Sequence, residues 1–216
     1  QVELAGQILG DRGALGFLAL AQLDIGAEAS RLALHRQPRL GIVAELFGAA
    51  VLLRAAGLGE APLLVRIASF NAYQEGWALY SEALMAELGA YRDDPLGDLG
   101  RLQDELFRAV RLVVDTGLHS KNWSRDQAIQ YMLDNSSMAE SDVTSEVERY
   151  IAIPGQALAY KVGALTIQRL RGKAQTALGP KFDIRGFHEQ VLMSGALPMD
   201  VLEAKIDRWI AARKAA

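Results

Sequence analysis

The spacing of hydrophobic residues along the chain changes near residue 66. Residues 1–66 are rich in Ala, Leu and Gly, and their apolar positions follow no clear period. Two helices can still be read there, over residues 13–34 and 38–57, with Gly26 as a weak point in the first. From residue 67 onward the pattern is sharper. We therefore expect a poorly matched helical segment over 1–66 and the main helical domain over 67–216.

The first two expected helices of the main domain have clear apolar patterns. Residues 72–88 are good helix formers and end before Gly89, a common helix stop. Residues 99–116 form a second helix, closed by Gly117. Its apolar residues recur at spacings of three and four, which predicts one buried stripe made of Leu102, Leu106, Ala109, Val110 and Val113.

Capping residues and helix breakers divide the rest of the chain. Ser124 followed by Gln127 fits a capping box. The next helix begins at Ser141 or Asp142 and must end by Ile153, because Pro154 disfavours the helical state of the residue before it. Three more helices are expected over residues 156–178, 182–194 and 198–216.

The fold class that follows is all-α. We expect about six helices after residue 70 and two before it, with no sequence repeat. No run of residues alternates with the two-residue period of a β-strand, and no dipeptide typical of a hairpin turn stands out.

Composition excludes several classes of protein. The chain has 216 residues, half of them hydrophobic, which is enough for a real core. The net charge is -3 and no basic stretch alternates with aromatic residues, so nucleic acid is not an expected partner. The chain has no cysteine, which excludes disulfides and thiolate ligands. The apolar run 46–53 is far shorter than the roughly 20 residues of a membrane-spanning helix, so no membrane span is expected.

Few residues suggest metal chemistry by pattern alone. None of the three histidines has a second histidine four residues away, and "HEQVL" at 188–192 has Leu192 where a second zinc ligand would stand. Glu75 lies beside Gly76 and Trp77 at the start of an apolar helix. Glu75 is either a first-turn carboxylate favoured by the helix dipole or a metal ligand.

Two other segments carry more polar residues than a core helix needs. Residues 111–123 hold Arg111, Asp115 and His119, where His119 fits a cation near the last carbonyls of a helix. In residues 149–163, a Pro-Gly break precedes a helix that carries Gln156, Tyr160 and Lys161. Such a break points a helix N-terminus at a cavity and favours an anion there. Tyr160 fits a half-buried core tyrosine equally well.

Together these three segments resemble one bacterial family, the domain-of-unknown-function 885 family. The resemblance rests on "FNAYQEGWALYSE" (70–82), "LFRAVRLVVDTGLHSKNW" (106–123) and "RYIAIPGQALAYKVG" (149–163). It extends from about residue 67 to about residue 212. The family looks like an all-helical zinc peptidase of the gluzincin type, similar in plan to the catalytic half of thimet oligopeptidase. The resemblance implies bacterial origin, this fold, and hydrolysis of peptide bonds.

The resemblance also implies roles for individual residues. Glu75 is the third zinc ligand, after two histidines of a His-Glu-x-x-His helix. Tyr160 is the expected donor to the oxyanion of the tetrahedral intermediate, with His119 as a second donor. Arg111, Lys161 and Gln156 are the expected substrate-binding residues.

The chain departs from the family pattern at one point. The His-Glu-x-x-His motif belongs before residue 70, and residues 1–66 contain only His35 there. The chain begins at Gln1, so we consider three explanations: a fragment whose N-terminal part is not native, a degenerate relative, or a motif in sequence not included. We expect zinc in intact relatives and no independent zinc catalysis by this chain.

The alternative function is a non-enzymatic helical module for peptide binding or assembly. In either case the expected partner is a peptide. The sequence does not determine the oligomeric state. Export to the periplasm or cell envelope is favoured only because many relatives look exported.

Overall fold

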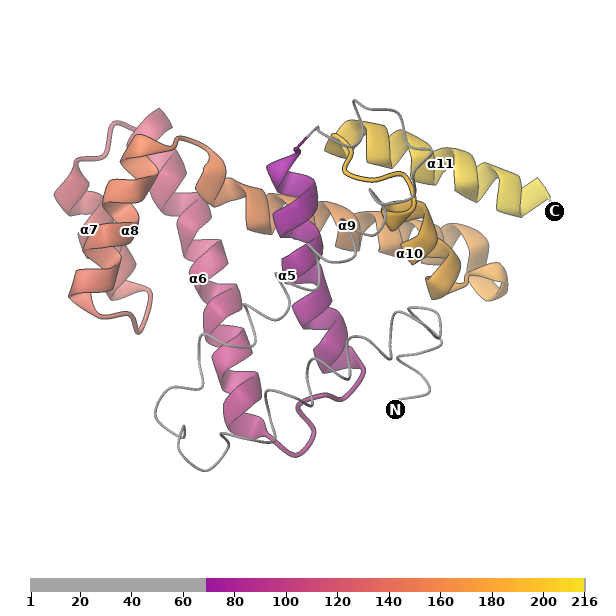
Figure 1. Ribbon diagram of the computed structural model, residues 1–216, viewed down its shortest axis with the longest axis horizontal. Coiled ribbons are helices and arrows are strands. Elements are labelled where there is room, and N and C mark those ends of the chain that lie inside the picture. Colours follow the sequence, from indigo (N-terminus) through magenta and orange to yellow (C-terminus); the bar gives the residue numbers. More distant parts are fainter. Residues whose placement is uncertain (1–68, 216) are drawn as a thin grey trace.

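The computed structural model describes residues 69–215, and this part is entirely helical (Figure 1). The sequence interpretations for residues 1–66, including both early helices and the domain boundary at 66/67, lie outside the described residues. The described residues form seven α-helices and one short 3₁₀ helix, against an expected count of about six helices: α5 Asn71–Glu87, α6 Pro95–Ser120, α7 Arg125–Asp134, α8 Glu140–Ala152, α9 Gln156–Leu178, η1 Gly179–Lys181, α10 Ile184–Leu192 and α11 Met199–Ala215.

Helix α9 starts beside α6 and continues underneath α5 to the side where α10 and α11 lie (Figure 1). Helices α7 and α8 lie at one of its ends and α10 and α11 at the other. Helix α5 crosses α9, and α6 meets the first turns of α9. The C-terminus lies at the far end of α11.

Two hydrophobic clusters hold this arrangement together. The larger cluster joins α5, α9, α10 and α11 and is centred on Tyr73, Trp77, Ile167 and Phe187, all fully buried. The smaller cluster joins α6, α7 and α8 to the first turn of α9. Because α9 contributes to both clusters, it fixes the position of one relative to the other.

Most predicted helix boundaries agree with the structure. Helix α9 has the bounds that were expected, and Gly89 adopts the left-handed φ of 81° that a helix stop requires. The capping box of Ser124 and Gln127 is present with both of its hydrogen bonds. Helix α8 ends at Ala152, one residue before the limit that Pro154 sets.

Helix α6 was predicted too short. It begins at Pro95, where Asp94 accepts a hydrogen bond from the Gly97 N–H, and it continues past Gly117 to Ser120. Gly117 does not end the helix. It leaves room for Trp123, whose ring would lie 2.4 Å from a Cβ placed on Gly117.

Two further sequence interpretations are wrong. Helix α8 begins at Glu140, after Ala139, and neither Ser141 nor Asp142 caps it. In the predicted stripe of α6 only Val110 is buried, while Leu102, Leu106 and Val113 are 47%, 51% and 39% exposed. The buried polar residues of α6 are Arg108, Arg111 and Asp115.

None of the described helices combines the length and apolar character needed to cross a bilayer.

Candidate functional site

The crossing of α5 and α9 is built on two glycines. A Cβ on Gly163 would lie 1.8 Å from the carbonyl oxygen of Ala72, and a Cβ on Gly76 would lie 2.4 Å from the Gly163 Cα. The two backbones therefore touch at this point. Glu75 directly precedes Gly76, and Tyr160 lies about one turn before Gly163, so the crossing brings both residues near the first turns of α9.

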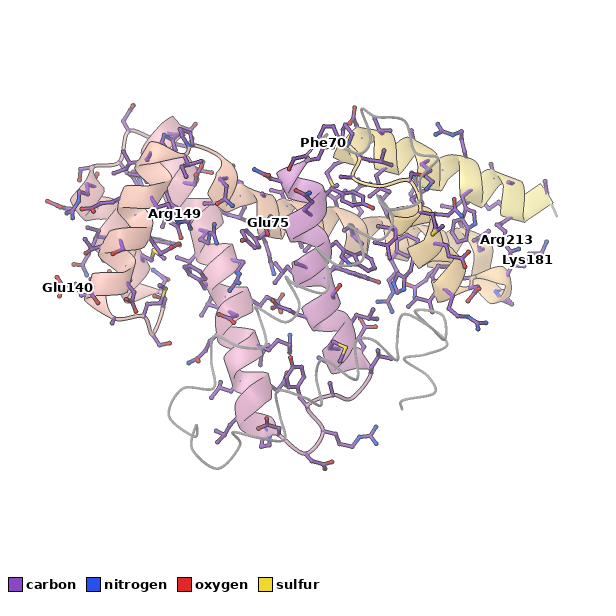
Figure 2. All side chains as sticks on the ribbon, viewed as in Figure 1. Phe70, Glu75, Glu140, Arg149, Lys181 and Arg213 are labelled. Carbon is purple, nitrogen blue, oxygen red and sulfur yellow. The ribbon has the colours of Figure 1, made fainter. Side chains whose placement is uncertain are left out.

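Gln156, the first residue of α9, connects the polar groups here. Its Oε1 accepts hydrogen bonds from Arg111 Nη2 at 3.0 Å and Arg149 Nη1 at 3.1 Å. Its Nε2 donates to Glu75 Oε1 at 3.4 Å. Two guanidinium donors fix the amide oxygen, and this leaves the amide nitrogen directed at Glu75. Figure 2 labels Glu75 on α5 and Arg149 on α8, two of the four helices that meet here.

Arg111 is held in an aromatic setting and is only 3% exposed. Its guanidinium carbon lies 4.6 Å from the ring centroid of Tyr160 and 5.3 and 5.4 Å from those of Tyr150 and Phe107. Cation–π contacts of this kind strengthen when water is excluded. Within the described part of the chain, no hydrogen-bond partner reaches its buried Nε.

Glu146 provides the negative charge on the α8 side of the site. It receives hydrogen bonds from Arg149 Nη2 and the Tyr150 hydroxyl, both at 2.6 Å. Burial by itself would raise the pKa of Glu146, but these hydrogen bonds and the charge of Arg149 outweigh it and lower that pKa. Burial raises the pKa of Tyr150, so its hydroxyl stays a donor at neutral pH.

The start of α9 binds an anion, as expected, and this anion is the carboxylate of Asp115. The N–H of Gly155, which caps α9 with a φ of 81°, donates to the Asp115 carboxylate at 3.0 and 3.3 Å. The Pro-Gly break therefore positions Gln156 and holds α9 against α6.

His119 and Lys161 point to other partners. His119 Nε2 lies 2.9 Å from the carbonyl oxygen of Tyr150, and His119 is eight residues beyond Arg111, about 12 Å along α6. Lys161 Nζ forms an ion pair with Glu105 at 2.7 Å. The contacts of the described residues thus bring together Glu75, Arg111, Gln156 and Tyr160, and they place His119 and Lys161 at the periphery.

Three members of this cluster were not predicted from the sequence: Glu146, Arg149 and Tyr150. Arg149 and Tyr150 open the third resembling segment, seven and six residues before Gln156. The helix-breaking Pro154 separates them from α9 in sequence. Only the fold shows that α8 turns back so that Arg149 reaches the same amide oxygen as Arg111.

The cluster has the chemistry of a site for a carboxylate or an amide. Guanidinium groups and a tyrosine hydroxyl donate hydrogen bonds, and Glu75 supplies a carboxylate. A catalytic zinc needs three protein ligands. Residues 69–215 contain no group of three His, Cys, Asp or Glu side chains able to hold a metal. The described residues therefore do not form a zinc site by themselves.

One of the comparisons with known proteins identifies a family. The model of the family described as "Bacterial protein of unknown function (DUF885)" matches residues 52–206. A crystal structure named "putative lipoprotein from Colwellia psychrerythraea" is 53% identical, with a TM-score of 0.73. The match covers 81% of this chain and 31% of that protein, so the chain spans less than a third of its length. A comparison with curated proteins gives no significant match.

Proposed function

The chain belongs to the DUF885 family of bacterial proteins, and from that premise we propose that it is the glutamate-bearing part of a zinc-dependent peptidase. Its plan would be that of the catalytic half of thimet-oligopeptidase-like enzymes. The family-level activity would be hydrolysis of peptide bonds. One observation supports this most directly: Glu75 is fixed at a glycine-lined helix crossing by an amide that two arginines orient.

The proposed roles follow from the contacts. Glu75 would supply one carboxylate ligand, with Gln156 holding one of its oxygens. Zinc, where an intact relative holds it, would supply a water that ionises near neutral pH. Tyr160 would donate to the oxyanion of the intermediate. Arg111, with Gln156 beside it, would bind a substrate carboxylate, and Lys161 and His119 would act from the periphery. The described residues alone supply too few ligands to hold the metal.

Metal content after a matched substitution tests this proposal. Glu75→Gln keeps the size of the side chain and removes its charge. In this chain we expect no difference in bound zinc between the two forms and no hydrolysis of peptides. In an intact relative that carries a His-Glu-x-x-His helix, the same change at the matching glutamate should remove bound zinc and nearly all activity.

Two results would contradict the proposal. Zinc retained by the relative after that change would exclude this glutamate as a ligand. One zinc per molecule in this chain, lost in Glu75→Gln by elemental analysis, would mean that unrecognised residues complete a site here.

The alternative, a module that binds peptides without cleaving them, is favoured by the aromatic setting of Arg111. Binding of a short peptide with a free C-terminal carboxylate, compared with its amidated form, distinguishes a carboxylate site from a purely structural arginine. Arg111→Met should then abolish the preference for the free carboxylate. Export to the periplasm or cell envelope is part of the proposal, and the lipoprotein description of the Colwellia relative supports it.

A further inference from the structure

Helix α6 buries three charged residues and exposes a row of apolar residues, while Val110 and Val114 are buried in the smaller cluster. Arg108, Arg111 and Asp115 are 8%, 3% and 2% exposed. At about 100° per residue, these three share one face of the helix. The opposite face carries four apolar side chains that are between 39% and 51% exposed: Leu99, Leu102, Leu106 and Val113. We call these four residues the outer stripe.

The outer stripe has the geometry of a helix-packing seam. Its residues are spaced by three, four and seven positions, with Ala109 halfway along the last interval. They span about 21 Å of helix at about 1.5 Å per residue. This spacing is the one by which a helix packs against another helix. An amphipathic helix at a protein surface has the reverse arrangement, with charged residues outward.

A helix with a polar site on one face and an apolar seam on the other belongs between two layers of structure. The inner layer is visible: Arg111 contacts Gln156 and Tyr160 of α9, and Lys161 of α9 pairs with Glu105. In the described structure the outer stripe stays exposed to water, although contiguous exposed apolar residues usually mark an interface.

The relative in the crystal structure is much longer than this chain. It shares 53% identity with this chain, yet the match takes up 31% of its length, so 69% (100 − 31) lies outside the match. We infer that the outer stripe of α6 is an interface for this remaining part of the longer family protein. In the complete protein α6 is then an interior helix, with the candidate site on its inner side.

A comparison of one double substitution in two proteins tests the inference. Leu102→Glu with Leu106→Glu places two carboxylates on the stripe. In this chain both positions are about half exposed, so the melting temperature should change by no more than about 2 °C. At the aligned positions of the full-length Colwellia relative, the same change buries two charges. It should lower the melting temperature of the relative by more than roughly 5 °C.

Val201→Glu on α11, 42% exposed, is the matched control and should have a small effect in both proteins. Three outcomes would overturn the inference. A small effect of the double substitution in the relative would show that the stripe is exposed there. A large effect in this chain would show that the chain covers its own stripe. Concentration-dependent self-association abolished by the double substitution would show that a second copy is the occupant. Since no outcome involves zinc or hydrolysis, the test is independent of the proposed function.

Discussion

Single glycines determine where the helices of this protein meet. Gly76 lies within the helical sequence "QEGWALY", although glycine weakens a helix by about 1 kcal/mol relative to alanine. The structure gives the reason: at Gly76 and Gly163 the backbones of α5 and α9 are in contact. Gly172 and Gly163 occupy the same helix, but only Gly163 is in such a contact.

Gly163→Ala should therefore destabilise the protein strongly. Its Cβ would lie 1.8 Å from the Ala72 carbonyl oxygen, and backbone cannot move aside cheaply, so we expect a loss of about 3 kcal/mol in the free energy of unfolding. Gly172→Ala is the control, because no atom lies within 4 Å of its Cβ. It should be neutral or stabilise by up to about 1 kcal/mol. Equal effects in urea denaturation would contradict this account of the crossing.

A second prediction at this scale concerns pH. His188 is buried, its Nε2 lies 2.8 Å from the Tyr80 hydroxyl, and burial lowers its pKa to about 4. This lowered pKa includes a smaller contribution from the charge of Arg171, which donates to the same hydroxyl, and an opposing one from Asp183. Between pH 6.5 and 4 the unfolded chain binds the proton and the folded chain does not.

The lowered pKa of His188 therefore does not reduce the free energy of unfolding above about pH 6.5. As the pH falls from 6.5 toward 4, it reduces the free energy of unfolding by up to about 3 kcal/mol. His188→Phe should remove this part of the slope of unfolding free energy against pH, whatever it does to stability at pH 7. A slope that is the same in both proteins over this window would mean that other groups cause it.

At the scale of elements, the start of α9 is where the site is assembled. Gly155 adopts a left-handed conformation, its N–H is bound by Asp115 of α6, and Gln156 follows at once. This one contact sets the register between α6 and α9. It therefore sets the position of Arg111 relative to Gln156.

Asp115→Ala should loosen this junction. The substitution removes a buried carboxylate that accepts a backbone N–H, and we expect a loss of about 2 kcal/mol in stability. Asp142→Ala, on the exposed first turn of α8 where no side chain caps the helix, should change stability by no more than about 0.5 kcal/mol. Similar melting temperatures for both variants would argue against a structural role for Asp115.

At the scale of the whole molecule, α9 links two clusters of unequal size. The larger contains 16 buried residues and the smaller 8. The smaller cluster buries less apolar surface, so it should open more easily than the larger one.

Native-state hydrogen exchange should show this difference. We expect the amides of α7 and α8 to exchange at a lower opening free energy than those in the centre of α9. Val143→Ala, in the smaller cluster, should lower the opening free energy of α7 and α8 by about 1–2 kcal/mol. The opening free energy at the centre of α9 should stay nearly unchanged, unless its amides exchange through global unfolding. A single opening free energy for all these helices would show that the described part unfolds as one unit.

The sequence by itself determined the all-helical class, the bounds of α9, the capping box at Ser124 and the family. These features depend on neighbouring residues: caps, helix stops and periodic apolar positions act over a few residues and are readable along the chain. The resembling segments also contained Glu75, Arg111, Gln156 and Tyr160, four residues that the structure brings together.

Tertiary structure alone decided the rest. It revealed that Gly76 and Gly163 are in contact and that Gly117 accommodates Trp123. It also revealed that Arg149 donates to the Gln156 amide oxygen and that His119 lies at the edge of the cluster, beside the Tyr150 carbonyl oxygen. It also showed that Arg108 and Arg111 of α6 are buried together with Val110, while Leu102 and Leu106 of the expected stripe are exposed. Periodicity shows that a helix has an apolar face, but which neighbour that face meets depends on contacts between residues far apart in the sequence.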